Sequence, residues 1–124
     1  MVDPRRTHQR VLDFALGLPG AYEDHPWEET VVKVNKKIFV FLGSEESPSW
    51  PSVTVKLGAS HEEALGVQGA EPTGYGLGRS GWVTVPLSTA KPPPIGVLTD
   101  WVEESYRLVA PKRLVAELDV SEER

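Results

Sequence analysis

Apolar positions near the start of the chain follow the spacing of one helix face. They recur every three or four residues, at Val11, Phe14, Ala15 and Leu18. Asp3 followed by Pro4 marks a helix start, because an aspartate side chain caps free backbone N–H groups and proline fits the first helical position. Pro19-Gly20 ends the pattern, so the sequence predicts an amphipathic helix that stops before these two residues.

The middle of the chain follows the two-residue period of β-strands. The β-rich runs 30–34 and 38–42 are separated by Asn35-Lys36-Lys37, which predicts a hairpin. Residues 52–57 alternate, with Val53, Val55 and Leu57 on one face and Ser52, Thr54 and Lys56 on the other. We therefore expect one face to be buried and the other to be at least partly wet. Residues 22–27 are expected to form an extended segment or edge strand, and residues 82–85 another strand.

Helical patterns return in the second half of the chain. Ser60 and Glu63 have the spacing of a capping box, which predicts a short helix, and residues 66–81 are expected to form a glycine-rich loop. A stiff connector, Lys91 to Pro94, precedes a longer helix with one apolar side, formed by Leu98, Trp101, Val102, Ser105 and Val109. Pro111 interrupts it, and residues 112–118 can add one or two turns. The order of elements predicts an α+β sandwich over residues 1–124, an antiparallel sheet covered on one face by the N- and C-terminal helices.

A glycine-rich string at residues 76–83 fits the Gly-x-Gly-x-x-Gly pattern of nucleotide-binding loops. Such a loop of the dinucleotide type needs a helix directly after the glycines, whose N-terminus binds the phosphate. Here the next residues are Trp82 to Pro86, which predict a strand. We therefore interpret the string as a flexible lead-in to a strand and expect no nucleotide cofactor.

Composition narrows the class of protein. The chain has no cysteine, so disulfides and thiolate metal sites are excluded. It has neither an apolar run of membrane-spanning length nor the apolar core of a signal peptide, and we expect a cytoplasmic protein. The net charge of −5 argues against strong non-specific binding of nucleic acid, unless the basic residues gather on one face.

Four stretches, in order, resemble the MmcQ/YjbR family, whose fold is similar to that of frataxin (CyaY-like). These are residues 18–27 (a Pro-Gly, acidic, aromatic opening), 37–40 (a Lys-hydrophobic-Phe strand), 53–56 (an alternating strand ending in lysine), and 77–85 followed by Ser105-Tyr106. The resemblance implies DNA binding through a pair of β-hairpin wings. Gly78 and Gly81 stand where the family usually has asparagine and histidine, whereas Arg79 and Trp82 keep a cation and an aromatic ring.

Five residues are candidates for contact with nucleic acid or another ligand: Lys36, Lys37, Lys56, Arg79 and Trp82. If the strands of Lys56 and Trp82 are neighbours, cations and an aromatic ring share one sheet face, which suits phosphate contact and base stacking. The alternatives are that Trp82 packs in the interior, that Lys56 is a solvated sheet residue, and that the hairpin lysines, Lys33 included, serve solubility.

Neither a metal site nor a catalytic group is evident. The three histidines are dispersed, and no serine has an identifiable base partner. We therefore expect a non-enzymatic protein without cofactor or metal, and favour a monomer.

Two functions remain open. The first is weak, salt-sensitive DNA binding through the open sheet face and hairpin wings. The second is a protein- or small-molecule-binding module with no nucleic-acid role, which predicts an apolar concavity near Trp50, Tyr75 and Trp82.

Overall fold

The computed structural model describes residues 3–48, 50–74 and 76–122. In chain order the elements are α1 (Pro4–Leu16), β1 (Tyr22–Asp24), the 3-10 helix η1 (Pro26–Glu28), β2 (Thr30–Val34), β3 (Lys37–Gly43), β4 (Ser52–Lys56), α2 (His61–Leu65), β5 (Glu71–Pro72), the 3-10 helix η2 (Leu77–Ser80), β6 (Trp82–Pro86), α3 (Ile95–Val109) and α4 (Lys112–Glu122).

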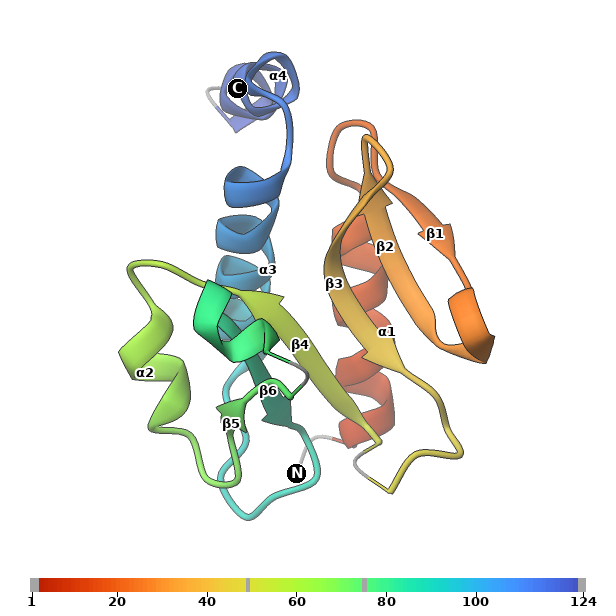
Figure 1. Ribbon diagram of the computed structural model, residues 1–124, viewed down its shortest axis with the longest axis vertical. Helices are drawn as coiled ribbons and strands as arrows, with labels where there is room; N and C mark the ends of the chain where they lie inside the picture. Colours follow the sequence, from red (N-terminus) through yellow and green to blue (C-terminus); the bar gives the residue numbers. More distant parts are fainter. Residues whose placement is uncertain (1–2, 49, 75, 123–124) are drawn as a thin grey trace.

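The strands form one antiparallel sheet in the order β1-β2-β3-β4-β6-β5, and α1 and α3 pack together against one face of it (Figure 1). The predicted α+β sandwich is therefore confirmed. Because β1 and β5 are the short outer strands, β3 and β4 lie at the centre of the sheet. We refer to the face away from α1 and α3 as the second face.

The helix starts and the hairpin follow the sequence signals. Asp3 caps α1 by accepting a hydrogen bond of 2.9 Å from the N–H of Arg5. The helix ends at Leu16, two residues before the predicted end at Leu18, although Leu18 still packs in the core. The β2–β3 hairpin forms as predicted, with two bulges that leave Phe39 and Leu42 without a cross-strand partner. These bulges turn Phe39, Val40 and Leu42 all toward the core.

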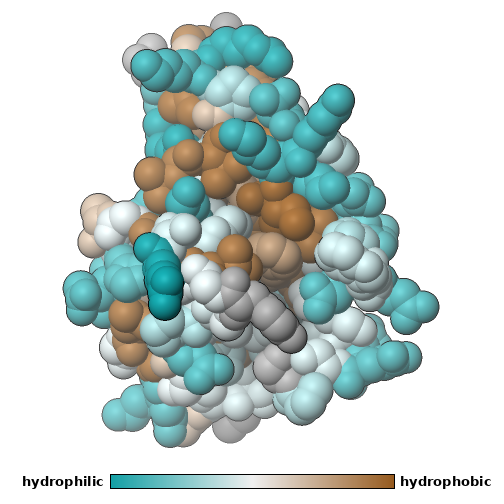
Figure 2. Space-filling view, viewed as in Figure 1, coloured by the Kyte–Doolittle hydropathy of each residue, from teal (hydrophilic) through white to brown (hydrophobic). Residues whose placement is uncertain are grey.

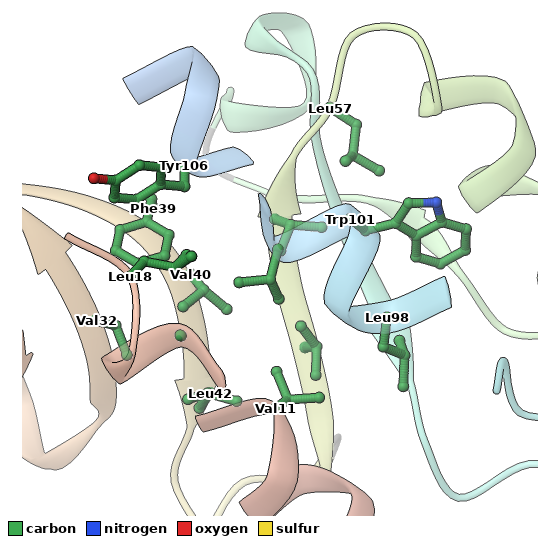
Figure 3. Packing of buried hydrophobic residues seen from close by; sticks show 14 of the residues in the cluster. Val11, Leu18, Val32, Phe39, Val40, Leu42, Leu57, Leu98, Trp101 and Tyr106 are labelled. Atoms are coloured by element: carbon green, nitrogen blue, oxygen red, sulfur yellow. The ribbon is translucent and has the colours of Figure 1, made fainter. Parts of the chain in front are cut away.

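The core lies between the sheet and the two long helices (Figure 3). Phe39 and Tyr106 meet edge to face within it, with ring centroids 5.3 Å apart. The sequence pattern missed Tyr106, which is fully buried and donates a hydrogen bond of 2.6 Å to the carbonyl oxygen of Pro19. This bond joins α3 to the turn that follows α1.

Three expectations about local structure were wrong. Ser52 and Thr54 are buried rather than wet, because the segment that includes η2 lies over the second face. The predicted capping box does not form, since the Ser60 hydroxyl donates instead to the Glu104 carboxylate, at 2.7 Å. Residues 66–81 are not simply a loop, because they contain β5 and η2. In addition, α4 extends to Glu122, beyond the predicted end at Leu118.

Candidate nucleic-acid interface

The strands that carry Lys56 and Trp82 are neighbours, as the shared-face hypothesis requires. Lys56 lies directly opposite Trp82 in the β4–β6 register, and directly opposite residues of antiparallel strands project from the same face. Thr54 lies opposite Thr84 on that face, where the two hydroxyl groups are 3.0 Å apart. Lys56 therefore projects from the second face.

Trp82 packs within the protein rather than presenting its ring to solvent. Only 8% of its surface is exposed, and its ring meets Phe41 edge to face, with centroids 5.3 Å apart. An indole held in this way has no free face for a nucleic-acid base. The geometry therefore fits the alternative in which Trp82 supports the second face by packing, while Lys56 beside it is half-buried.

Lys36 and Lys37 stand at the tip of the β2–β3 hairpin. Asn35 and Lys36 have φ values of 50° and 68°, which is the left-handed pair of a two-residue type I′ turn. Such a turn matches the twist of the flanking strands, so the two exposed lysines are presented at a defined position. Lys33, by contrast, is already engaged, because its ammonium group lies 2.7 Å from the Asp24 carboxylate.

Arg79 lies on η2, within the glycine string. Gly76 and Gly81 flank this short helix with φ values of 79° and 95°, so the string is an ordered turn, and the predicted strand β6 follows it. A Cβ atom at Gly81 would lie 2.6 Å from the carbonyl oxygen of Leu57, and one at Gly78 would lie 2.8 Å from Cβ of Pro72. The histidine and asparagine of the family therefore do not fit this backbone.

Register places the four cations at one end of the sheet. Val40 pairs with Val55, so the start of β3, which carries Lys37, lies at the same end as the last residue of β4, Lys56. Strand β6 also starts there, and Arg79 comes just before it. A hydrogen bond of 2.9 Å from the N–H of Leu57 to the carbonyl oxygen of Gly81 joins the two segments.

Ser105 of α3 links β3 and β4 at this end of the sheet. Beyond the Val40–Val55 pair, β3 and β4 diverge, as Figure 1 shows. The Ser105 hydroxyl donates to the carbonyl oxygen of Phe39 at 2.5 Å and accepts the N–H of Lys56 at 3.0 Å. Ser105 is fully buried, so this single hydroxyl bridges the two strands where their own pairing stops. The sequence pattern placed Ser105 on the packed side of α3 but gave no sign of this role.

The charges of these cations are not neutralised by ion pairs. Among the described residues, no carboxylate lies within ion-pair distance of Lys36, Lys37, Lys56 or Arg79. Arg107 shows the opposite situation, because Asp119 and Glu122 lie 2.8 Å and 3.0 Å from its guanidinium group. The end of the sheet that carries Lys36, Lys37, Lys56 and Arg79, which we call the hairpin end, therefore offers cations to an anionic partner. Arg107, by contrast, holds α4 against α3.

A separate groove lies between α1 and the β3–β4 loop. It encloses about 550 Å³ and includes Trp50, on which the Arg5 guanidinium stacks at 5.3 Å from a ring centroid. His8 meets Trp50 edge to face, and its Nε2–H donates to the carbonyl oxygen of Leu42 at 2.7 Å. Burial lowers the pKa of His8 below 6.5, against the opposing effects of this hydrogen bond and of Glu45.

The concavity predicted from the tryptophans is therefore only partly matched. Trp50 lines a groove, but the groove is charged rather than apolar, and the buried Trp82 does not line it. Tyr75 lies outside the described residues. In the part of the chain that the structure describes, no three histidine or carboxylate side chains come together as metal ligands. No described helix is long and apolar enough to cross a membrane.

The fold and the hairpin end define an α+β protein with an open antiparallel sheet, helices on one face, and a cationic β-hairpin tip. A sequence model of the YjbR family matches residues 16–108, three quarters of the chain, and the chain belongs to this family. No curated protein matches the chain significantly.

Proposed function

We propose that this YjbR-family protein is a non-enzymatic DNA-binding protein that contacts the phosphate backbone with the hairpin end of its sheet. The single observation that carries the proposal is the placement of four cations at this end without carboxylate partners among the described residues: Lys36, Lys37, Lys56 and Arg79. Backbone contacts of this kind supply most of the affinity in non-specific binding. The proposal agrees with the wing-type DNA binding that the family resemblance implies, and with a cytoplasmic location.

The proposed contact differs from the sequence-based hypothesis in one respect. Trp82 is not used as a stacking platform, because its ring is buried against Phe41. Without stacking, affinity rests on phosphate contacts alone, and the acidic total charge of −5 weakens it further. We therefore expect weak binding with a steep dependence on salt and little preference for sequence.

The variant Lys36→Gly gives the sharpest test of this contact. It removes one cation, while glycine adopts the left-handed backbone of Lys36 more readily than lysine does. A loss of binding therefore cannot be ascribed to unfolding. Fluorescence polarisation with a labelled duplex of about 20 base pairs, starting near 50 mM salt, measures affinity and its salt slope.

We expect Lys36→Gly to weaken binding and to reduce the slope of log affinity against log salt by about 0.9. Lys91→Gln is the matched control, because Lys91 is exposed and follows the opposite end of β6. It removes the same charge and should leave the slope unchanged. Equal slopes for the two variants, or no binding by the parent protein at low salt, would refute the proposal.

A second candidate is a protein- or small-molecule-binding module, and the Trp50 groove favours it. Arg5 and His8 offer polar groups beside an aromatic wall, as ligand sites commonly do. The view in Figure 2 also shows apolar surface over β3, so the second face is not uniformly polar. A Trp50→Ala variant that keeps its fold and its DNA binding but loses a ligand found by screening would support this candidate.

A further inference from the structure

Trp27 is the most exposed large apolar side chain among the described residues. Its exposed fraction is 93%, whereas Trp82 and Trp101 are buried. Trp27 lies in η1, between β1 and β2, at an outer corner of the sheet (Figure 1). Leaving an indole in water forgoes a large gain from burial, and the exposed ring is free to contact a partner.

The backbone at Trp27 adopts an energetically unfavourable conformation. Trp27 and Glu28 have φ values of 51° and 66°, in the left-handed region that side chains other than glycine rarely adopt. Each such residue costs about 1–2 kcal/mol. Strained residues of this kind are concentrated at binding and catalytic sites, where the surrounding structure fixes them.

The strand beside Trp27 has a free edge. β1 pairs with β2 through one edge, and no strand in the described part of the chain pairs with the other. An open strand edge is a template for an extended segment of another protein, whose backbone adds a strand to the sheet. Tyr22, 41% exposed, starts this strand, so apolar side chains lie at both ends of the segment from Tyr22 to Trp27.

The charge around this edge is negative. Between residues 22 and 29 there are four carboxylates, with neither lysine nor arginine, and these are Glu23, Asp24, Glu28 and Glu29. Asp24 is paired with Lys33 and Glu23 with His25, but Glu28 and Glu29 have no ion-pair partner among the described residues. Glu28 also lines the Trp50 groove, where it, Glu45 and Glu46 outnumber the single arginine, Arg5.

We propose that this edge, formed by Tyr22–Asp24 with Trp27, Glu28 and Glu29, docks an extended lysine- or arginine-rich segment of a partner protein. The segment adds a strand to β1, its cations meet the carboxylates, and one of them stacks on the Trp27 indole. The proposal does not depend on DNA binding. η1 precedes β2 and Lys36 follows it, so Trp27, Glu28 and Glu29 lie at the opposite end of that strand from the hairpin tip, whereas the first residue of β1, Tyr22, pairs with Lys33.

The negative charge of this edge favours a basic segment over a second copy of the chain and over nucleic acid. A second copy of the chain would bring the same four carboxylates against each other across the new strand pair, and like charges facing one another oppose association. Nucleic acid would be repelled in the same way. A basic segment can pair its backbone with the open edge of β1 and place its cations beside the carboxylates.

The test uses a fluorescein-labelled peptide of about ten residues in which lysine alternates with threonine, a length that covers β1 and η1. The matched peptide replaces each lysine with glutamate. Polarisation should show binding of the lysine peptide only, and Trp27→Ala should weaken it by about tenfold. Because Trp27 is exposed, this variant is expected to fold normally.

Charge-reversed pairs separate this site from general attraction to an acidic protein. Glu28→Lys with Glu29→Lys should weaken peptide binding by tenfold or more, whereas Glu62→Lys with Glu63→Lys, an equal charge change on exposed residues of α2, should change it by less than about threefold. Equal effects of the two pairs, or unchanged binding by Trp27→Ala, would overturn the proposal. So would a dimer in sedimentation velocity that Trp27→Ala dissociates.

Discussion

The buried hydroxyl of Ser105 donates a hydrogen bond of 2.5 Å to the main-chain carbonyl oxygen of Phe39, one of the two bulged residues of β3. The same oxygen of Ser105 accepts the N–H of Lys56, so a residue of α3 completes the sheet at the point where β3 and β4 separate. The end of the sheet that carries Lys56 and the hairpin tip therefore depends on one hydroxyl group.

Ser105→Ala tests this dependence. The variant leaves the Phe39 carbonyl and the Lys56 N–H without a protein partner, and each buried group left in this way costs about 1–3 kcal/mol. We expect the free energy of unfolding to fall by about 2–4 kcal/mol in urea denaturation. Thr99→Ala is the control, because the Thr99 hydroxyl bonds only to the Gly96 carbonyl on an exposed part of the same helix. A loss in Ser105→Ala no larger than in this control would contradict the assigned role.

Gly81→Ala tests the constraint on the glycine string. An alanine there would be strained at φ 95°, and its Cβ would meet the backbone oxygen of Leu57. We expect destabilisation of more than about 2 kcal/mol. The matched change, Gly96→Ala, lies in α3 with nothing within 4 Å of the new Cβ and should stabilise the protein by about 0.5–1 kcal/mol. Thermal unfolding compares the two, and similar melting temperatures would show that Gly81 tolerates a side chain.

Glu104 predicts a dependence of stability on acid pH. Burial alone would raise the pKa of this carboxyl, but hydrogen bonds from the Ser60 hydroxyl and from the N–H groups of Ser60 and Gly58 outweigh it and lower the pKa below 4.5. A carboxyl whose pKa is lower in the folded state stabilises the fold above its unfolded pKa. This contribution is lost as the pH falls through the folded pKa.

We therefore expect the stability of the parent protein to fall more steeply below about pH 4.5 than that of Glu104→Gln, whose side chain does not titrate. Urea denaturation between pH 6 and pH 3 measures both. Parallel profiles would contradict the bonding assigned to Glu104.

His8 should remain neutral to a lower pH than an ordinary histidine. Its pKa lies below 6.5, because burial outweighs the effects of the Leu42 carbonyl and Glu45. Where the folded state holds a histidine neutral, stability decreases as the pH falls below the unfolded pKa. NMR titration of the imidazole resonances gives the pKa directly. A midpoint of 6.5 or above for His8 would contradict its packing against Trp50.

The sequence predicted the layers and the main strands because their signals are local. Alternating valines mark β4, the apolar stripe marks α1, and Asp3-Pro4 marks its start. It could not show that Trp82 is buried, because that depends on the edge contact with Phe41 from a strand two places away in the sheet. The burial of Thr54 likewise depends on η2 and the segment around it, which fold over the second face.

In the candidate site, too, local sequence signals predicted some residues, whereas the roles of others depend on tertiary contacts. Lys36 and Lys37 were identified from their place between two β-rich runs, and the register of β3, β4 and β6 brings Lys56 and Arg79 to the same end. Ser105 and Trp27 could not be singled out in advance. A serine on an apolar helix face gives no sign of which strands it bridges, and an aromatic residue near an acidic turn is as compatible with packing as with exposure.

The most direct test of phosphate contact at the hairpin end is NMR titration of the 15N-labelled protein with a DNA duplex of about 20 base pairs at low salt. We predict amide shift changes gathered at Lys36, Lys37, Lys56 and Arg79, which diminish as salt is added, with little change at the acidic edge from Glu23 to Glu29. Shift changes scattered over the surface, gathered around the Trp50 groove, or absent at low salt would contradict DNA binding by this surface.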